Sequence, residues 1–143
     1  MRSGWLVLAL AAAAFAGTAR AETATATLQV SAVVLPHVRL QQDTAPVAIT
    51  AADIQRGYRD VERRYTLETN EPERVLLQLN PRSGLTDSVD VAGLRAPLRM
   101  ADSTIEISQP LARQFTLTYR LWLNAAAVPG SYALPVQVAA VLR

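Results

Sequence analysis

Two apolar alternations near the end of the printed chain constrain its fold more than any other feature. In residues 113–124 and again in residues 131–143, nearly every second side chain is apolar. The apolar faces are formed by Phe115, Leu117, Tyr119, Leu121 and Leu123 in the first run, and by Tyr132, Leu134, Val136, Val138, Ala140 and Leu142 in the second. A period of two is typical of a β-strand, whose successive side chains point to opposite faces of the sheet. Because Pro129-Gly130 lies between the runs, we predict a closing β-hairpin that lays one apolar side on the core.

Short alternating segments separated by turn residues continue through the rest of the chain. Eight to ten strands are predicted, with Pro, Gly and Asp marking the turns between them. In residues 58–69, a β-bulge near Val61 would bring the larger apolar side chains onto one face. This pattern predicts an all-β fold, either an antiparallel sandwich or a small barrel.

One short helix is predicted over residues 50–57. Thr50 lies three residues before Asp53, which is the spacing of a capping box, and Gly57 is a suitable helix stop. Such a helix has only one or two turns and little intrinsic stability, so a tight connection between strands is the alternative.

The first residues carry the features of a signal peptide. Arg2 gives a positive start, residues 5–16 form an uncharged apolar run, and Ala19 and Ala21 are the small residues that a signal peptidase reads. We predict cleavage after Ala21, which leaves residues 22–143 as one exported domain in the periplasm, on the cell surface or in the medium. The apolar run is shorter than the roughly 20 residues that span a bilayer, and no later run comes closer, so no integral membrane span is predicted for the mature chain.

Charge and cysteine content exclude several classes of partner and site. The chain has 14 basic and 12 acidic residues, and two of the basic ones, Arg2 and Arg20, lie in the predicted signal peptide. The remaining charge is balanced, so it gives no basis for binding nucleic acid or an anionic membrane. The absence of cysteine excludes disulfides, thiol chemistry and Cys-based metal sites. Stability must then come from sheet packing.

No residue is assigned a catalytic, cofactor or metal-binding role. His37 is the only histidine, it follows Pro36 at a strand start, and no serine lies in a Gly-x-Ser-x-Gly motif. The carboxylates lie in or beside predicted turns, where solvated acidic residues are expected. We therefore expect a protein that is not an enzyme and holds no cofactor or metal.

Two charged or aromatic features are candidates for recognition. Trp122 has the polar neighbours Thr118, Arg120 and Asn124 in register, so it is predicted to face outward. Arg120 and Trp122 then form a surface patch that binds a sugar or a partner protein, unless a second layer or a loop covers it. Arg63 and Arg64 follow the acidic residues Asp60 and Glu62. We interpret this arginine pair as a charged strand edge that discourages edge-to-edge pairing, and recognition of an acidic glycan is the alternative.

The two ends of the chain resemble a known family. The sequence FTLTYRLWLNAAAVPGSYALPVQVAAVL, residues 115–142, is similar to the end of bacterial fimbrial and spore-coat-U-like secreted subunits. The alternation TATATLQVSAVVL, residues 23–35, is similar to the extension that such subunits insert into a neighbour. The resemblance implies an immunoglobulin-like sandwich, export, and assembly by donor-strand complementation, with a chaperone, an usher or like subunits as protein partners. The chain departs from the family in having no cysteine pair.

Strand addition needs an apolar groove and a segment whose alternate side chains fill it. The predicted donor side chains lie in residues 22–34, and they are Ala24, Ala26, Leu28, Val30 and Ala32. The same residues would also serve as the first strand of a self-contained domain. We therefore expect a structural or assembly protein, and the alternative is a binding module for a glycan or an envelope protein that uses Arg120 and Trp122.

Overall fold

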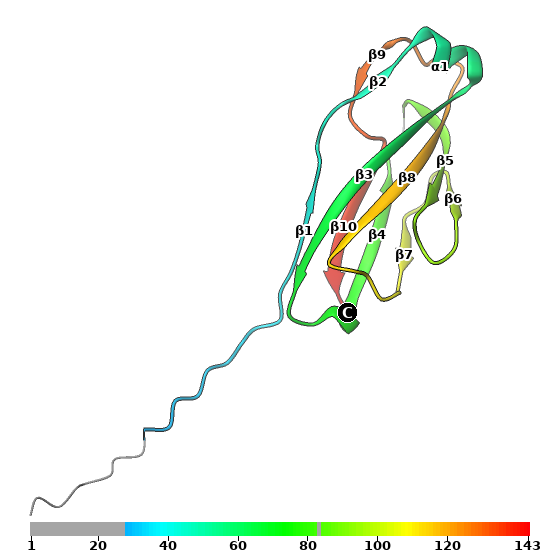
Figure 1. The fold of residues 1–143 in the computed structure, drawn as a ribbon. Coiled ribbons are helices and arrows are strands. Elements are labelled where there is room, and N and C mark those ends of the chain that lie inside the picture. Colours follow the sequence, from blue (N-terminus) through cyan, green and yellow to red (C-terminus); the bar gives the residue numbers. More distant parts are fainter. Residues whose placement is uncertain (1–27, 83) are drawn as a thin grey trace, which may run out of the picture. The chain divides into compact units, whose positions relative to one another are not determined.

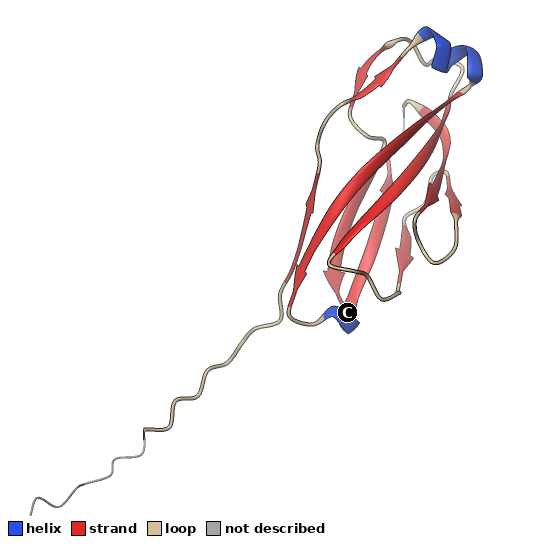
Figure 2. Cartoon of the chain, in the orientation of Figure 1, coloured by secondary structure: helices blue, strands red, loops and turns tan. Residues whose placement is uncertain are grey.

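The computed structural model describes residues 28–82 and 84–143, in two units that are considered separately. Of the first unit, Met1–Val33, the described residues 28–33 form neither helix nor strand. The second unit, Val34–Arg143, holds ten strands, the helix α1 (Ala51–Arg56) and the 3-10 helix η1 (Pro72–Arg74) (Figures 1 and 2). The strands are β1 (Val38–Gln42), β2 (Val47–Ile49), β3 (Tyr58–Thr69), β4 (Val75–Pro81), β5 (Thr86–Ala92), β6 (Leu98–Met100), β7 (Ile105–Ile107), β8 (Gln114–Leu123), β9 (Gly130–Tyr132) and β10 (Val136–Leu142). The prediction of an all-β, sandwich-like fold with one short helix is confirmed.

The strands form two facing sheets and one small pair, and every pairing is antiparallel. The large sheet has the order β1-β3-β8-β5-β6, the small sheet has the order β10-β4-β7, and β2 pairs with β9. Both sheets contribute to one cluster of buried apolar side chains, to which the β2–β9 pair adds Val47 and Ile49. No helix in the described part of the chain is long and apolar enough to cross a membrane.

The strand order corresponds to that of an immunoglobulin-type sandwich. Such a sandwich has strands A-B-E-D in one sheet and C-F-G in the other. Across the large sheet, β1, β3, β8 and β5 take the places of A, B, E and D. In the small sheet, β4 and β10 take the places of C and F. None of the ten strands found in residues 28–82 and 84–143 takes the place of G, which would lie beside β10.

The predicted closing hairpin is wrong, because its two strands belong to different sheets. β8 pairs with β3 and β5, whereas β10 pairs with β4. The segment between them is more than a turn, since it includes β9, which pairs with β2. The prediction of the faces was correct for β8, whose side chains at 117, 119 and 121 are fully buried. An alternating pattern identifies the buried face of a strand but not its neighbour, because both sheets bury their apolar faces in the same core.

The interior of the large sheet contains a buried pair of tyrosines. The hydroxyl oxygens of Tyr65 on β3 and Tyr119 on β8 are 2.6 Å apart, so each hydroxyl has a partner in the core. The Tyr65 ring also stacks on Phe115, with ring centroids 5.3 Å apart. Burial raises the pKa of both hydroxyls above the ordinary tyrosine value.

The short helix α1 has the predicted capping box. The Asp53 backbone N–H donates to Thr50 Oγ1 over 3.3 Å, and the Thr50 N–H donates to Asp53 Oδ2 over 2.9 Å. Gly57 ends the helix in the left-handed region at φ 82°, where glycine carries no steric cost. Asp53 is fully buried and also accepts from Arg56 and Arg59. Hydrogen bonding from the Thr50 backbone lowers the Asp53 pKa from 3.8 to about 2.

One of the two predictions about β3 is wrong. The register between β3 and β8 runs without a break from Tyr58 opposite Trp122 to Thr66 opposite Gln114, so there is no bulge near Val61. Tyr58 lies on the outer face with Trp122 instead. The interpretation of the pair at 63–64 as a charged strand edge agrees with the register, because β1 pairs only with residues 65–69 of β3 and, in the described part of the chain, residues 63 and 64 pair with β8 alone. Arg63 shares the inward phase of the buried Val61 and Tyr65 and donates from Nη2 to the Ala45 carbonyl over 2.5 Å.

Candidate functional site

The edge of β10 that faces away from β4 is the candidate functional site. β10 pairs with β4 along its whole length, from Val136 opposite Pro81 to Leu142 opposite Val75. No strand in the described residues pairs with the other edge, although β1 runs beside it. Such an edge presents backbone N–H and C=O groups that another strand can satisfy.

Partly exposed apolar side chains line the seam between β1 and β10. Val136 and Val138 at the start of β10 are buried, but Ala140 and Leu142, which continue the same inward phase, are only half-buried. On the β1 side, Val38 and Leu40 are also half-buried. The apolar face of the sandwich is therefore less completely covered along the part of this seam that lies toward η1.

The predicted donor residues are only partly described. Ala24 and Ala26 lie outside the described residues. Leu28 and Val30 are 85% and 77% exposed, and Ala32 is also exposed. None of the three belongs to a strand. Exposed large apolar side chains at every second position are what a strand needs to fill an apolar seam.

Residues 35–37, which precede β1 in the second unit, are held at the end of β3 next to η1. The Asn70 side chain donates from Nδ2 to the Leu35 carbonyl over 3.1 Å and accepts from the His37 N–H over 2.9 Å. The Thr69 hydroxyl donates to the His37 carbonyl over 2.9 Å. Residues 35–37 are thus fixed to the η1 end of the second unit.

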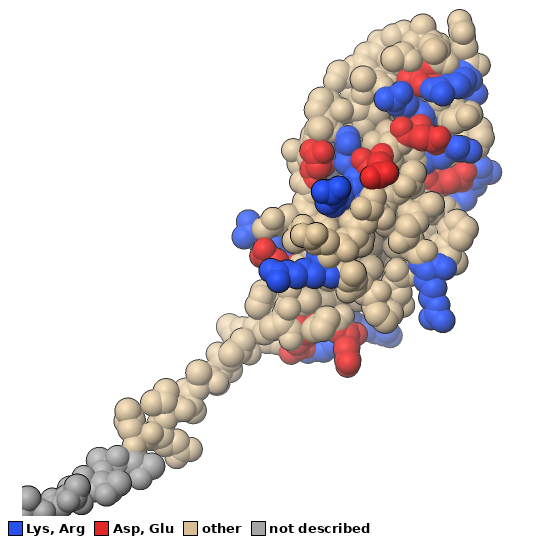
Figure 3. Space-filling view, in the orientation of Figure 1, with Lys and Arg blue, Asp and Glu red and all other residues tan. Residues whose placement is uncertain are grey.

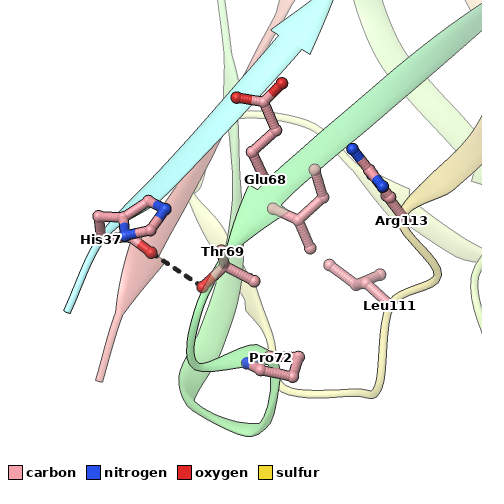
Figure 4. A pocket seen from close by; sticks show the side chains of 7 residues that line it. His37, Glu68, Thr69, Pro72, Leu111 and Arg113 are labelled. Carbon is pink, nitrogen blue, oxygen red and sulfur yellow. Dashed lines mark hydrogen bonds between the residues drawn. The ribbon is translucent and has the colours of Figure 1, made fainter. Parts of the chain in front are cut away.

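A small pocket lies at this junction (Figure 4). Its volume is about 330 Å³, and its lining residues are His37, Leu67, Glu68, Thr69, Pro72, Leu111 and Arg113. Figure 4 shows His37 and Arg113 on opposite sides, with Pro72 below them. His37 is an exposed residue directly before β1, as predicted. Across residues 28–82 and 84–143, no three His, Asp or Glu side chains gather in a way that could hold a metal ion.

Arg120 and Trp122 lie on the outer face of the large sheet. The Arg120 guanidinium makes two hydrogen bonds to Asp60, at 2.8 and 3.0 Å, and lies 4.5 Å from the centre of the Tyr58 ring. Trp122 donates from Nε1 to Asp90 Oδ2 over 2.8 Å, and its ring centre lies 5.4 Å from that of Tyr58. The prediction that both residues share the outer face agrees with the register. Neighbouring side chains half-bury Trp122, in place of the second layer or loop that was the alternative.

Four charged residues form a row across four strands beside these aromatic rings. The register places Asp60, Arg120, Asp90 and Arg99 opposite one another in turn. Arg99 makes two hydrogen bonds to Asp90, at 2.6 and 3.2 Å. Hydrogen bonds from Arg120 and Arg99 lower the pKa values of Asp60 and Asp90, respectively. Each charge in the row therefore has a partner within the chain.

This pairing makes the outer face a weaker candidate for ligand binding than the β10 edge. Figure 3 shows acidic and basic side chains interspersed over the upper part of the view, without a large patch of one sign. A ligand at this face would have to displace existing ion pairs or the arginines that lie over the two aromatic rings. No local pattern in the sequence marks Asp90 and Arg99, and only the strand register brings them to Trp122.

Comparison with known proteins gives no match to a family model, a curated protein or a solved structure. The two features of the described chain that point to a binding role are the free edge of β10 and the exposed apolar residues before β1.

Proposed function

We propose that this protein is an exported, non-enzymatic assembly subunit that joins like subunits by strand addition. Residues 28–34 of one copy pair with the free edge of β10 in the next copy. The observation that carries the proposal is the strand order, in which the place beside β10 that strand G takes in an immunoglobulin-type sandwich is not filled by any described strand.

The side chains of the segment support the same proposal. Leu28 and Val30 are the large members of an alternating set, and both are exposed. Burying a Leu or Val side chain contributes about 1.5–3 kcal/mol, so these two supply most of the apolar stabilisation. The smaller Ala32 adds a shallow contact in the same phase.

Strand addition requires β1 to move outward. β1 and β10 have Cα atoms within 8 Å of one another. Two strands that flank a third lie roughly 10 Å apart, because neighbouring strands are separated by about 4.7–4.9 Å. β1 is an edge strand of five residues whose one partner among the described strands is β3, so it is the element best able to shift.

The proposal is tested by placing charge on one face of the segment. In the full chain, Leu28→Asp with Val30→Asp should abolish self-association measured by light scattering, because two carboxylates would enter an apolar seam. Gln29→Asp with Ser31→Asp is the matched control, since it adds the same charge on the opposite phase. Equal association of the two variants would contradict strand addition.

A second measurement locates the contact. A photo-crosslinking residue at Val30 should react with β10 of another copy, which peptide mapping identifies. Crosslinks confined to other strands would argue against β10 as the acceptor. Export is tested separately by cell fractionation and by sequencing the mature N-terminus, which is expected at Glu22.

In this proposal, chaperone and usher partners are proteins that hold the free edge of β10 before assembly. A chaperone of this kind supplies a temporary strand to β10 and competes with residues 28–34. Co-purification from a periplasmic extract, lost when β10 is occupied by a peptide of residues 22–35, would support this role.

A further inference from the structure

A loop at the α1 end of the sandwich presents exposed apolar residues. We call residues 125–129, between β8 and β9, the apical loop. Val128 is 59% exposed, and it is the only large apolar side chain of the described second unit that is exposed, apart from Val34 and Leu35 beside the segment. Ala125, Ala126 and Pro129 are exposed around it.

The apical loop is held in one conformation by hydrogen bonds. The Ala127 N–H donates to the Asn124 carbonyl over 3.1 Å, and the Ala126 N–H donates to Asn124 Oδ1 over 3.1 Å. The Tyr132 hydroxyl donates to the Val128 carbonyl over 2.7 Å. Because the loop is already ordered, little conformational entropy is lost when it binds a partner.

A pocket at the opposite end of the sandwich combines apolar side chains with three polar or charged ones. This basal pocket has a volume of about 480 Å³, and its lining residues are Pro72, Glu73, Val75, Ser108, Gln109, Pro110 and Leu111. It shares Pro72 and Leu111 with the pocket in Figure 4. Its rim is fixed through Arg74, which pairs with Glu71 at 2.6 Å and donates from Nε to the Arg143 carbonyl over 2.9 Å.

The apical loop and the basal pocket lie at opposite ends of β8. The pocket residue Leu111 precedes this ten-residue strand, and the apical loop follows it. At about 3.4 Å per residue, the strand separates them by roughly 30 Å within one copy. Figure 1 shows β9 and α1 at one end of the sandwich, and the C-terminus with the β3–β4 turn at the other.

The direction of the added strand decides which ends of two copies meet. β10 runs from the α1 end toward η1, because Leu142 pairs with Val75 and the Arg143 N–H donates to the Arg74 carbonyl over 2.8 Å. Every strand pair in the structure is antiparallel, so an added strand should run from the η1 end toward the α1 end. Residue 34 of the donor copy then lies at the α1 end of the acceptor.

The donor sandwich follows within a short length of chain. His37 lies only three positions beyond residue 34, and Asn70 fixes it at the η1 end of its own sandwich. Three residues span at most about 10 Å. The η1 end of the donor, with its basal pocket, is therefore held close to the α1 end of the acceptor, with its apical loop.

We infer that the apical loop of one copy docks into the basal pocket of the next copy. The inference rests on the proposed function, since strand addition brings the two surfaces together. Val128 enters the pocket against Pro110 and Leu111, and the fixed rim at η1 faces the base of the loop. A contact between different patches on the two copies is heterologous, and repetition of it builds an open fibre rather than a closed dimer.

Cysteine pairing tests this contact directly, because the natural chain has no cysteine. Full chains carrying both Val128→Cys and Gln109→Cys are oxidised mildly and separated without reductant. A disulfide needs Cα atoms about 4.4–6.8 Å apart, so the two positions cannot bridge within one copy. We expect a ladder of covalent oligomers. Val128→Cys with Thr118→Cys is the control, because Thr118 is exposed on the outer face in the middle of β8.

The Val30 crosslink, measured in the same samples, separates the two claims. If Val30 reacts with β10 of another copy but no ladder forms, the docking inference is overturned and strand addition stands. If neither crosslink forms, both are overturned. A ladder together with the Val30 crosslink supports both.

A charge substitution provides a second readout that leaves the core intact. Val128→Asp should weaken self-association by at least about tenfold, since burial of a valine contributes about 1.5–3 kcal/mol. Gln55→Asp, at an exposed position of α1 at the same end, should not weaken it. Equal association of the two variants would overturn the inference even if a disulfide ladder had formed.

Discussion

β8 and β10 have the same alternating pattern, yet they differ in how completely the fold encloses them. β8 pairs on both edges, and its inward side chains Leu117 and Leu121 are 0% exposed. Among the described strands, β10 has a pairing partner on one edge only, and its inward side chains change from buried at Val136 to half-buried at Leu142. An alternating apolar face thus predicts a strand, whereas the number of paired neighbours determines whether that strand is fully enclosed or keeps one edge free.

The largest expected effect comes from removing matched leucines from the two strands. Leu117→Ala on β8 should lower the free energy of unfolding by about 2–5 kcal/mol, because it leaves a cavity in the closed part of the core. Leu142→Ala on β10 should cost less than half as much, since its side chain is already partly hydrated. Urea unfolding of both variants measures the difference. Equal losses would mean that β10 is as enclosed as β8.

Carboxylates near the ends of β8 and β10 should differ in how much stability they lose in acid. β8 ends against the α1 turn, where the Leu123 N–H donates to the Gly57 carbonyl over 2.9 Å and Asp53 caps the helix. The Asp53 pKa is lowered from 3.8 to about 2, so this carboxylate contributes about 2 kcal/mol above pH 4. That stability is lost as pH falls through about 2.

Asp53→Asn should remove most of this acid dependence, and urea unfolding between pH 2 and pH 6 measures it. Glu71→Gln, near the end of β10, is the control, because Glu71 is partly exposed and its ion pair with Arg74 lies in solvent. If the free energy of unfolding of Asp53→Asn still fell in acid as it does for the natural chain, other carboxylates would be responsible for the loss.

Removing hydroxyls from the buried tyrosine pair should change the free energy of unfolding by a smaller amount, and the second substitution should partly reverse the effect of the first. Tyr119→Phe removes one hydroxyl from β8 and leaves the Tyr65 hydroxyl without its 2.6 Å partner, which should cost about 1–2 kcal/mol. Adding Tyr65→Phe removes the unpaired group and should recover part of the loss. A double-mutant cycle from thermal or urea unfolding shows this coupling, and additive losses would mean that the two hydroxyls act independently.

The smallest expected effect concerns the outer face of β8. Arg120→Ala breaks an ion pair with Asp60 in which both side chains are nearly half exposed. The unfolding midpoint should therefore change less than in any preceding variant, and less still in high salt. Trp122→Ala, tested on a glycan array, addresses the binding-module alternative, and loss of a specific signal with an intact fold would favour that alternative.

Local sequence signals predicted a large part of this structure. The capping box at Thr50 and Asp53 and the stop at Gly57 involve neighbours in the chain, so the spacing alone was enough to find the helix. The buried face of β8 was also correct, because side-chain alternation is a local property of a strand. The exposed apolar residues Leu28 and Val30 were singled out as donor side chains for the same reason.

Other features depended on partners far away in the sequence. Trp122 meets Asp90 only because β8 and β5 share a register, and Arg63 faces inward because β3 continues without the predicted bulge. The pair at 63–64 was predicted as a charged strand edge, and the register does place these two residues beyond the end of β1. No local signal distinguishes that role from an inward arginine that reaches the Ala45 carbonyl.

The sequence by itself determined that this chain forms alternating strands with one capped helical turn, because period and capping are set by residues within a few positions of one another. Only the tertiary structure decided that β8 and β10 lie in opposite sheets and that no described strand pairs with one edge of β10. Strand pairing depends on which apolar faces meet across the core, and every strand here presents a similar face.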